Sequence, residues 1–345
     1  MSNDVTQIDT AALDAWFRAH VSGYQGPLNA EKFATGQSNP TFLVAAASGR
    51  YVLRRKPPGT LLKSAHAIER EYAVMQALAA SAVPVPRMLA LCEDAGVIGT
   101  PFYVMAHVDG RIFWDPAVPD VSRGDRAAIY DDMNRVLAAL HAVDPQAVGL
   151  GGFGRPGNYF ARQIARWGEQ YRASETGVIA DMDALTLWLA VNMPPDDGRV
   201  AIVHGDYRID NFIFAKDAPV IAAVLDWELS TLGHPFADLA YQCMQWRLPN
   251  EGVFRGLAGV DREALGIPGE DAYVALYCKR AGLGAMTHWA FYLAFSFFRL
   301  AAILQGVKKR ALEGNASNPE RGLQMGEAVP VLAKLAMQLA RGGNP

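Results

Sequence analysis

One stretch of the chain, residues 200–228, constrains the fold more than any other part of the sequence. It reads VAIVHGDYRIDNFIFAKDAPVIAAVLDWE. Two short apolar runs, 200–203 and 220–225, are typical of strands, and each is followed directly by polar residues. Between them, residues 212–214 and the turn at 216–219 predict a hairpin. The stretch therefore predicts strands whose ends carry acidic and amide side chains.

The polar residues at these strand ends occur in the order that phosphoryl transfer requires. The first run leads into His204-Gly205-Asp206, Asn211 lies five residues after the aspartate, and Asp226 ends the later run. In phosphoryl transfer one carboxylate accepts the proton of the acceptor hydroxyl, while an amide and a second carboxylate hold Mg²⁺ on the phosphates. Each residue alone is also common in turns. The ordered set within 23 residues favours a catalytic site.

This stretch resembles the catalytic core of the aminoglycoside phosphotransferase and choline kinase-like superfamily, a distant relative of protein kinases. In that superfamily the kinase His-Arg-Asp becomes His-Gly-Asp, and the magnesium-binding Asp-Phe-Gly becomes a bare aspartate. The resemblance implies an α+β, two-lobed protein-kinase-like fold. Residues 1–105 would form an N-lobe with an antiparallel sheet and a helix. Residues 106–345 would form a larger, mostly helical C-lobe, with a hinge at about 106–110.

The same resemblance implies ATP and Mg²⁺ as cofactors and assigns roles to single residues. Asp206 would be the catalytic base, and Asn211 and Asp226 would hold Mg²⁺. We expect His204 to brace the catalytic loop rather than to transfer protons. Asp238 resembles the superfamily's buried aspartate, which binds the backbone of this loop.

The N-terminal third contains a candidate phosphate-binding turn. Residues 33–44 predict two strands joined by a turn that contains Gly36, Gln37, Ser38 and Asn39. Small residues allow backbone N–H groups to approach phosphates closely. An ordinary hairpin has the same pattern, and the multi-glycine loop of protein kinases is absent. The turn alone therefore leaves both interpretations open, and its place ahead of the next elements favours the functional one.

The elements that follow carry a candidate ion pair. Residues 51–55 predict a strand and residues 64–80 a helix. Arg54 occupies the position at which kinases carry a phosphate-binding lysine, although arginine is planar and bidentate where lysine is not. Glu71 falls on the apolar face of the helix, where a carboxylate needs a cationic partner. We expect Glu71 to fix Arg54, which would clamp the α- and β-phosphates, and we expect Glu69 to face solvent.

Two further assignments follow from the kinase-like layout. By alignment with the superfamily, the carbonyl of Ala106 and the N–H of Val108 would bind the adenine edge. His141 ends a helix predicted within residues 125–143 and is expected to be a core or capping histidine rather than a base, because the constellation already has its base in Asp206.

Composition excludes several other classes of protein. A net charge of −3 on 345 residues argues against a nucleic-acid binder. The three cysteines show neither metal spacing nor a disulfide framework, and the N-terminal residues lack the basic and apolar regions of a signal peptide. We therefore expect a cytoplasmic protein. Residues 289–307 are mostly apolar, but Arg299 at their centre would cost about 2.5 kcal/mol or more in a bilayer, so we expect a buried helix and no membrane partner.

Further segments narrow the resemblance to one branch of the superfamily. That branch is the kinase-like domain found at the N-terminus of certain multidomain acyl-CoA dehydrogenases and as stand-alone bacterial proteins, in which an arginine at position 54 is usual. The resemblance covers about residues 33–245 and thins out in the C-terminal helices. The segments that carry it are GQSNPT at 36–41, YVLR at 51–54, KPPG at 56–59, IGT at 98–100, FYVM at 102–105, GRIF at 110–113 and LDWELST at 225–231.

The resemblance to this branch implies an acceptor. It would be the hydroxyl of a small molecule, best a hydroxyacyl-CoA, phosphorylated so that a separate acyl-CoA dehydrogenase can complete its conversion. We expect acceptor contacts in the C-terminal helices, predicted at about 271–281, 288–311 and 325–341. These helices carry Arg299 and a basic run at 308–310. For the basic run, charge that complements a helix dipole is the favoured interpretation over an anionic-substrate contact.

Two other functions remain open at this stage. One is a kinase for an aminoglycoside or another small alcohol, although a polycationic aminoglycoside requires an acidic site and these helices are basic. The other is a pseudokinase-like, nucleotide-binding scaffold, which would fit Arg54 and the sparse phosphate turn. A scaffold has no need of the complete set of Asp206, Asn211 and Asp226, so the sequence favours an enzyme.

Overall fold

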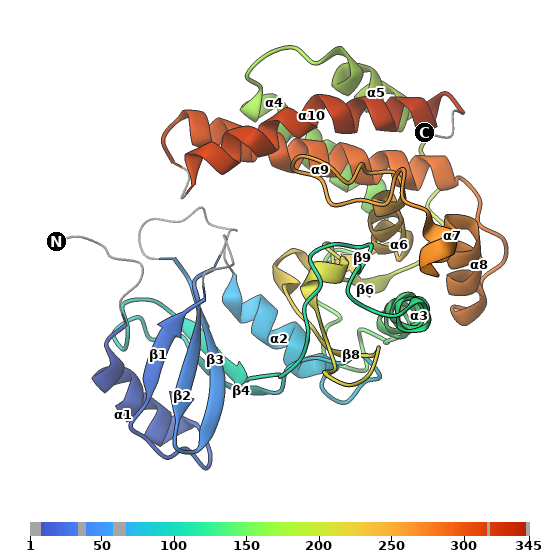
Figure 1. The fold of residues 1–345 in the computed structure, drawn as a ribbon. Coiled ribbons are helices and arrows are strands. Elements are labelled where there is room, and N and C mark those ends of the chain that lie inside the picture. The colour runs from blue at the N-terminus through green and yellow to red at the C-terminus, as the bar shows by residue number, and fades with distance from the viewer. Residues whose placement is uncertain (1–7, 34–38, 58–66, 316–317, 343–345) are drawn as a thin grey trace. The chain divides into compact units, whose positions relative to one another are not determined.

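The computed structural model describes residues 8–33, 39–57, 67–315 and 318–342 of the chain (Figure 1). The chain divides into two compact units. The first comprises Met1–Arg111, Ile213–Lys216 and Ala222–Ser230, and the second comprises Ile112–Phe212, Asp217–Ile221 and Thr231–Pro345. The lobe boundary at 105 and the hinge at about 106–110 stay predictions.

The first unit is built on an antiparallel sheet with two helices. The five strands lie in the order β1-β2-β3-β5-β4. Their bounds are Asn29–Lys32 for β1, Thr41–Ala46 for β2, Gly49–Arg55 for β3, Met88–Cys92 for β4 and Phe102–Ala106 for β5. Helix α1 spans Thr10–His20 and α2 spans Ile68–Leu78. The sheet and helix expected for the N-lobe are therefore confirmed.

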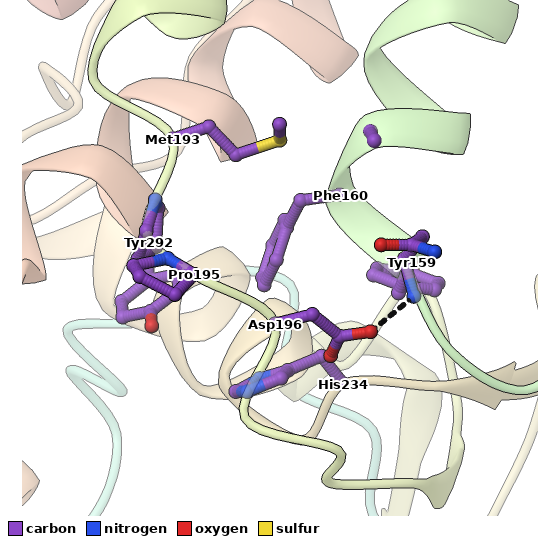
Figure 2. A pocket seen from close by; sticks show the side chains of 10 residues that line it. Tyr159, Phe160, Met193, Pro195, Asp196, His234 and Tyr292 are labelled. Carbon is purple, nitrogen blue, oxygen red and sulfur yellow. Dashed lines mark hydrogen bonds between the residues drawn. The ribbon is translucent and has the colours of Figure 1, made fainter.

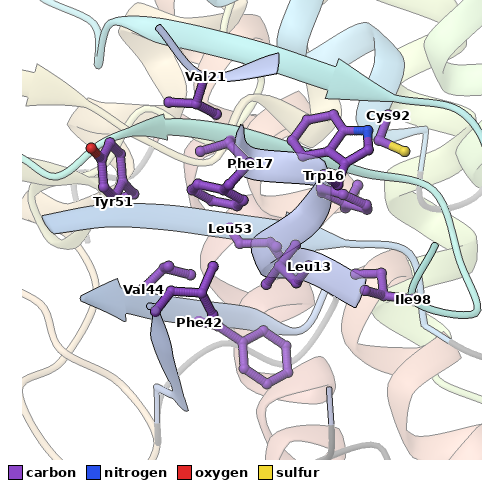
Figure 3. Packing of buried hydrophobic residues seen from close by; sticks show 13 residues of the cluster. Leu13, Trp16, Phe17, Val21, Phe42, Val44, Tyr51, Leu53, Cys92 and Ile98 are labelled. Carbon is purple, nitrogen blue, oxygen red and sulfur yellow. The ribbon is translucent and has the colours of Figure 1, made fainter. Parts of the chain in front are cut away.

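Helix α1 packs its apolar face on the sheet (Figure 3). The helix begins because the side chain of Asp9 accepts hydrogen bonds from the backbone of its first turn. Trp16 and Phe17 then join a buried cluster with alternate residues of the strands, such as Leu53 in β3. Because side chains alternate between the two faces of a strand, the next residue, Arg54, points to the opposite face. The packing of α1 thus fixes which face of the sheet receives the arginine.

The second unit is mostly helical. Helix α9 lies beside α10, and α4, α5 and α6 also pack on α9 (Figure 1). The helix bounds are Arg123–His141 for α3, Tyr159–Ser174 for α4, Ala180–Val191 for α5, Phe236–Cys243 for α6, Arg262–Leu265 for α7, Glu270–Arg280 for α8, Trp289–Leu312 for α9 and Pro319–Ala340 for α10. The sequence placed the start of α10 near 325. The helix begins earlier because Asn318 caps it by accepting a hydrogen bond from the N–H of Arg321 at 3.0 Å.

Short elements carry the catalytic motifs. Strand β6 (Ala201–Val203) pairs antiparallel with β9 (Thr231–Gly233). Strands β7 (Phe212–Phe214) and β8 (Ile221–Val224) form the two-stranded sheet that the sequence predicted as a hairpin. The described part of the chain also contains the single-turn 3₁₀ helices η1 (Ile209–Asn211), η2 (Trp227–Leu229) and η3 (Met244–Trp246).

Helix α9 contains the apolar segment that the sequence analysis singled out. Among the described residues, it is the one helix long and apolar enough to cross a membrane, with a mean hydropathy of 1.6 over its most apolar window. Of that window, 72% is buried inside the protein. Burial against α4, α5, α6 and α10 accounts for the apolar sequence, as it does in core helices of soluble proteins.

Candidate active site

In the first unit, β3 and α2 bring a partly buried arginine and a buried glutamate together. The Nε atom of Arg54 lies 2.9 Å from Oε2 of Glu71, and the side chains are 14% and 1% exposed. Asn39 donates its amide to Oε1 of Glu71 at 2.8 Å, and the hydroxyl of Tyr103 donates to Oε2 at 3.1 Å. The ion pair predicted between Arg54 and Glu71 is confirmed, and its glutamate is held from three sides.

The guanidinium of Arg54 stays charged in this setting. Burial is the largest effect and disfavours the charged form, but Glu71, Tyr103, Asp226 and Glu228 together outweigh it, so the pKa of Arg54 lies above its ordinary value. Glu69, which was expected in solvent, is 44% exposed and lies 2.9 Å from Nζ of Lys56. Of the two glutamates of α2, Glu71 is therefore buried and Glu69 lies toward solvent, as their positions on the helix predicted.

A second acidic residue joins Arg54 from a distant part of the sequence. The Nη2 atom of Arg54 donates to Oδ1 of Asp226 at 3.0 Å, and Oε2 of Glu228 lies 3.7 Å away. Asp226 stands between β8 and η2 in the left-handed region, with φ 63° and ψ 61°. This conformation is uncommon for residues other than glycine, and aspartate is one of the residues that adopt it most readily. The sequence marked Asp226 but gave no sign of its bond to Arg54, because 172 residues separate them.

In the second unit, a buried aspartate anchors the catalytic loop by its backbone. Oδ2 of Asp238, on α6, accepts a hydrogen bond from the N–H of His204 at 2.6 Å, and Oδ1 accepts one from the N–H of Gly205 at 2.8 Å. The ring of His204 in turn lies 3.1 Å from the N–H of Asp206, placed to accept it at Nδ1. Asp238 and His204 thus make the backbone contacts expected of residues that brace the loop, and that structural role stays a prediction.

Charge and burial have opposite effects on the pKa of Asp238. Its side chain is 1% exposed, and burial alone would raise its pKa, but hydrogen bonds from His141 and from the loop bring the pKa below the ordinary value. His141 is itself buried and lies within hydrogen-bonding distance of the hydroxyl of Tyr277 and of Asp238, at 2.7 and 3.3 Å. It is the core histidine that the sequence predicted.

The carboxylate of Asp206 is oriented by its neighbours and is 21% exposed. The amide of Asn211 donates to the backbone oxygen of Asp206 at 2.8 Å and to its Oδ2 at 3.0 Å. Arg208 brings its Nε to 3.3 Å from Oδ1, and the hydroxyl of Tyr241 hydrogen-bonds to the same carboxylate. Burial would raise the pKa of Asp206, but Arg208, Tyr241 and Asn211 lower it overall. The group is therefore ionised at neutral pH and able to accept a proton.

Arg208 and Tyr241 were missed in the sequence. Arg208 lies in the loop two residues beyond Asp206, and Tyr241 follows Asp238 by three residues on α6. Residues three apart share a helix face. The spacing of three residues between Asp238 and Tyr241 was therefore the signal in the sequence that Tyr241 faces the catalytic loop.

The residues predicted to hold Mg²⁺ supply suitable donors. The amide nitrogen of Asn211 is used in its two bonds to Asp206, which leaves the amide oxygen as the donor for a cation. Asp226 supplies a carboxylate that is 33% exposed. Oxygen donors of these two kinds fit Mg²⁺. Asn211 belongs to the second unit and Asp226 to the first, and their joint role stays a prediction.

The remaining nucleotide-binding assignments also stay predictions. Ala106 ends β5, where its N–H donates to the carbonyl of Arg87 at 2.9 Å, and Val108 follows in a segment without regular structure. Gly36, Gln37 and Ser38 lie outside the described residues. Asn39 is described, and its side chain is engaged with Glu71 rather than facing solvent.

A small pocket lies in the second unit, between the start of α4, the segment before β6 and α9 (Figure 2). Its volume is about 50 Å³, room for one or two water molecules rather than a whole substrate. Asp196 borders it and accepts a hydrogen bond from the N–H of Asn158 at 2.5 Å (Figure 2). The labelled side chains that line it are mostly apolar or aromatic: Tyr159, Phe160, Met193, Pro195 and Tyr292, with Asp196 and His234. The sequence did not predict this pocket.

Comparison with known proteins gives the family. The profile of the phosphotransferase enzyme family matches residues 29–276. The mouse protein named acyl-CoA dehydrogenase family member 10 is 49% identical over 316 residues, which make up 91% of this chain and 29% of that protein. The chain thus spans less than a third of the length of that relative.

Solved structures agree with this assignment. A structure from Ralstonia eutropha JMP134, named provisionally as an aminoglycoside phosphotransferase, is 51% identical, with a TM-score of 0.89 over 98% of this chain and 100% of that one. A thermostable variant of aminoglycoside phosphotransferase APH(4)-Ia, solved with ADP and hygromycin B, shares the fold at 14% identity, with a TM-score of 0.63 over 98% and 99% of the two chains. The chain therefore belongs to the phosphotransferase enzyme family and has the kinase-like fold that its catalytic motif predicted.

Proposed function

We propose that this phosphotransferase moves the γ-phosphoryl group of ATP to the hydroxyl of a small molecule, with Asp206 as the base. The observation that carries the proposal is the carboxylate of Asp206, which Asn211 and Arg208 contact on a loop anchored by Asp238. A base in phosphoryl transfer must be deprotonated, oriented and able to reach solvent-borne substrate. Asp206 meets these conditions through Asn211, Arg208 and its partial exposure.

The other site residues position the donor. Arg54, held by Glu71, carries a fixed positive charge suited to the α- and β-phosphates. Asn211 and Asp226 would hold Mg²⁺, which when bound neutralises charge on the transferring phosphoryl group. The role of the chain is then mainly orientation and charge stabilisation, with proton acceptance at an Asp206 carboxylate oxygen. The ADP complex of APH(4)-Ia supports ATP as the donor.

For the acceptor we propose a hydroxyacyl-CoA, whose phosphorylated product would pass to an acyl-CoA dehydrogenase. The support is the 49% identity to a protein named as an acyl-CoA dehydrogenase family member, across 91% of this chain. Phosphorylation of the hydroxyl would make it a better leaving group for the later reaction. An aminoglycoside is the second candidate, supported by the provisional name of the R. eutropha structure.

A screen for acceptor-dependent ADP release would test the proposal. The matched pair is a hydroxyacyl-CoA and the same acyl-CoA without the hydroxyl, with aminoglycosides and sugars alongside. We expect ADP release and a phosphorylated product, seen by mass spectrometry, only with the hydroxylated thioester. Turnover with aminoglycosides and not with hydroxyacyl-CoAs would overturn the acceptor. Tight binding of ATP·Mg²⁺ without turnover on any acceptor would instead indicate a scaffold.

A further inference from the structure

Helix α9 carries a buried arginine whose Nε has no hydrogen-bond acceptor among the residues that the structure describes. Arg299 is 4% exposed, and its Nε is buried without a partner. Within residues 8–33, 39–57, 67–315 and 318–342, no carboxylate pairs with it and no oxygen accepts from it. Arg126, equally buried at 3%, differs sharply, since it donates to the carbonyl oxygens of Val118, Val121 and Leu265.

The guanidinium of Arg299 lies near two aromatic rings. Its Cζ atom lies 5.6 Å from the ring centre of Trp167 on α4 and 5.4 Å from that of Tyr241 on α6. Cation–π attraction offsets only part of the free energy lost when a guanidinium leaves water. A buried charge is normally paired and hydrogen-bonded. An oxygen-bearing ligand would therefore supply the acceptor that the described residues do not give the Nε of Arg299.

One tyrosine side chain separates Arg299 from the proposed base. The tyrosine ring that it contacts belongs to Tyr241, whose hydroxyl hydrogen-bonds to Asp206. The charge of Arg299 also acts on Tyr159, which lines the small pocket (Figure 2). Burial raises the pKa of Tyr159 to about 12, and Arg299 opposes that rise. One tyrosine side chain thus connects the unpaired cation to the carboxylate that would accept the hydroxyl proton.

We propose that Arg299 binds a carbonyl or carboxylate oxygen on the acyl portion of the acceptor, near the hydroxyl that Asp206 deprotonates. The inference rests on the proposed function, because it places the acceptor hydroxyl at Asp206. The phosphates of a CoA thioester are separated from its acyl group by the long pantetheine arm, so an arginine this near the base contacts the acyl end. A polycationic aminoglycoside offers no oxyanion here and would add positive charge beside an unpaired cation.

The test compares Arg299→Met and Arg299→Lys with Lys309→Met, a control on the same helix. Lys309 is 38% exposed and pairs with Glu313 at 3.2 Å. With a hydroxyacyl-CoA we expect Arg299→Met to lower kcat/KM for the acceptor at least tenfold, mainly through KM. Arg299→Lys should retain part of the native kcat/KM, because lysine keeps the positive charge but lacks the planar fork of the guanidinium. Calorimetric Kd values for ATP·Mg²⁺ should stay within twofold in all three variants.

Thermal stability separates binding from a structural role. Removing an unpaired buried charge leaves stability unchanged or raises it, so we expect the Tm of Arg299→Met to equal or exceed that of the native protein. Parallel assays with the free hydroxy acid identify the oxygen: a loss confined to the thioester indicates the thioester carbonyl, and a loss confined to the acid indicates a carboxylate.

Three results would overturn the inference. The first is an unchanged acceptor KM in Arg299→Met, the second is a lower Tm with undiminished activity per folded molecule, and the third is an equal loss of activity in Lys309→Met. If Arg299→Met does not fold, that result indicates a structural role for Arg299. An unchanged acceptor KM in Arg299→Lys would then confirm that the role is structural. If the native protein phosphorylates no hydroxyacyl compound, the proposed function fails instead.

Discussion

Replacing Asp238 with asparagine removes the charge that anchors the catalytic loop and keeps the shape of the side chain. The native carboxylate accepts two backbone N–H groups, from His204 at 2.6 Å and from Gly205 at 2.8 Å. Asparagine has one acceptor oxygen, so its NH₂ group must face one of these N–H donors. A hydrogen bond to a charged group contributes about 1.5–3 kcal/mol, and an orphaned buried donor costs a similar amount. We expect a loss of about 3 kcal/mol in the free energy of unfolding.

Urea denaturation at pH 7 would measure this loss, with the exposed Asp217→Asn as control. For a domain of roughly 200 residues, 3 kcal/mol corresponds to a fall in Tm of about 6–12 °C. Asp238 is 1% exposed and fixes the loop that carries Asp206. Because its loss would loosen this loop, kcat should fall as well. A free energy of unfolding within about 0.5 kcal/mol of the native value would refute the anchoring role, since surface substitutions fall in that range.

The pH dependence of the same difference gives a second check. The pKa of Asp238 is lowered in the folded state, so its contribution is complete above the unfolded value of about 3.9 and is lost as the pH falls through the folded pKa. The difference between native protein and Asp238→Asn should therefore be constant from about pH 7 to 5 and shrink only below about pH 4. A difference that grows in acid would contradict this sign.

Three further predictions concern the proposed site. Arg54→Lys should raise the KM for ATP about tenfold or more, because one ammonium cannot match the fork that contacts both Glu71 and Asp226; initial rates at varied ATP would show it, and an unchanged KM would contradict it. Asp226→Asn should raise the Mg²⁺ concentration for half-maximal activity several-fold, as measured by Mg²⁺ titration, whereas an identical titration curve would argue against metal binding. Since the pKa of Asp206 is lowered, kcat/KM should stay flat from about pH 8 to 5. Arg208→Ala should move the acid limb of the pH–rate profile to higher pH. An acid limb that does not move would exclude the charge of Arg208 as a cause of the lowered pKa.

Local patterns made much of the fold and half of the site predictable. The ion pair of Arg54 and Glu71 followed from helical periodicity, because a glutamate on the apolar face of α2 needs a cation. The anchoring of the loop by Asp238 and the bracing by His204 followed from the resemblance to the superfamily. In each case a short-range pattern or a short motif contained the information.

Contacts between distant segments were not predictable in this way. Arg54 meets Asp226 across 172 residues, and neither residue shows by its neighbours that it will do so. Tyr241 reaches Asp206 because α6 also carries Asp238, which a single sequence marks only weakly. The start of α10 was missed because its Asn318 cap precedes the apolar repeat. Arg299 was visible as a charge in an apolar helix, but only the structure shows that it lacks an acceptor among the described residues.

The most direct test of the central claim is a single-turnover measurement on Asp206→Asn with ATP·Mg²⁺ and a hydroxyacyl-CoA. The variant keeps the shape of the side chain and removes the proton acceptor. We expect phosphoryl transfer to slow by about 10²–10⁴-fold, while calorimetry shows ATP·Mg²⁺ binding within about threefold of the native protein and the Tm changes little. Near-native transfer by Asp206→Asn would contradict the assignment of Asp206 as the base.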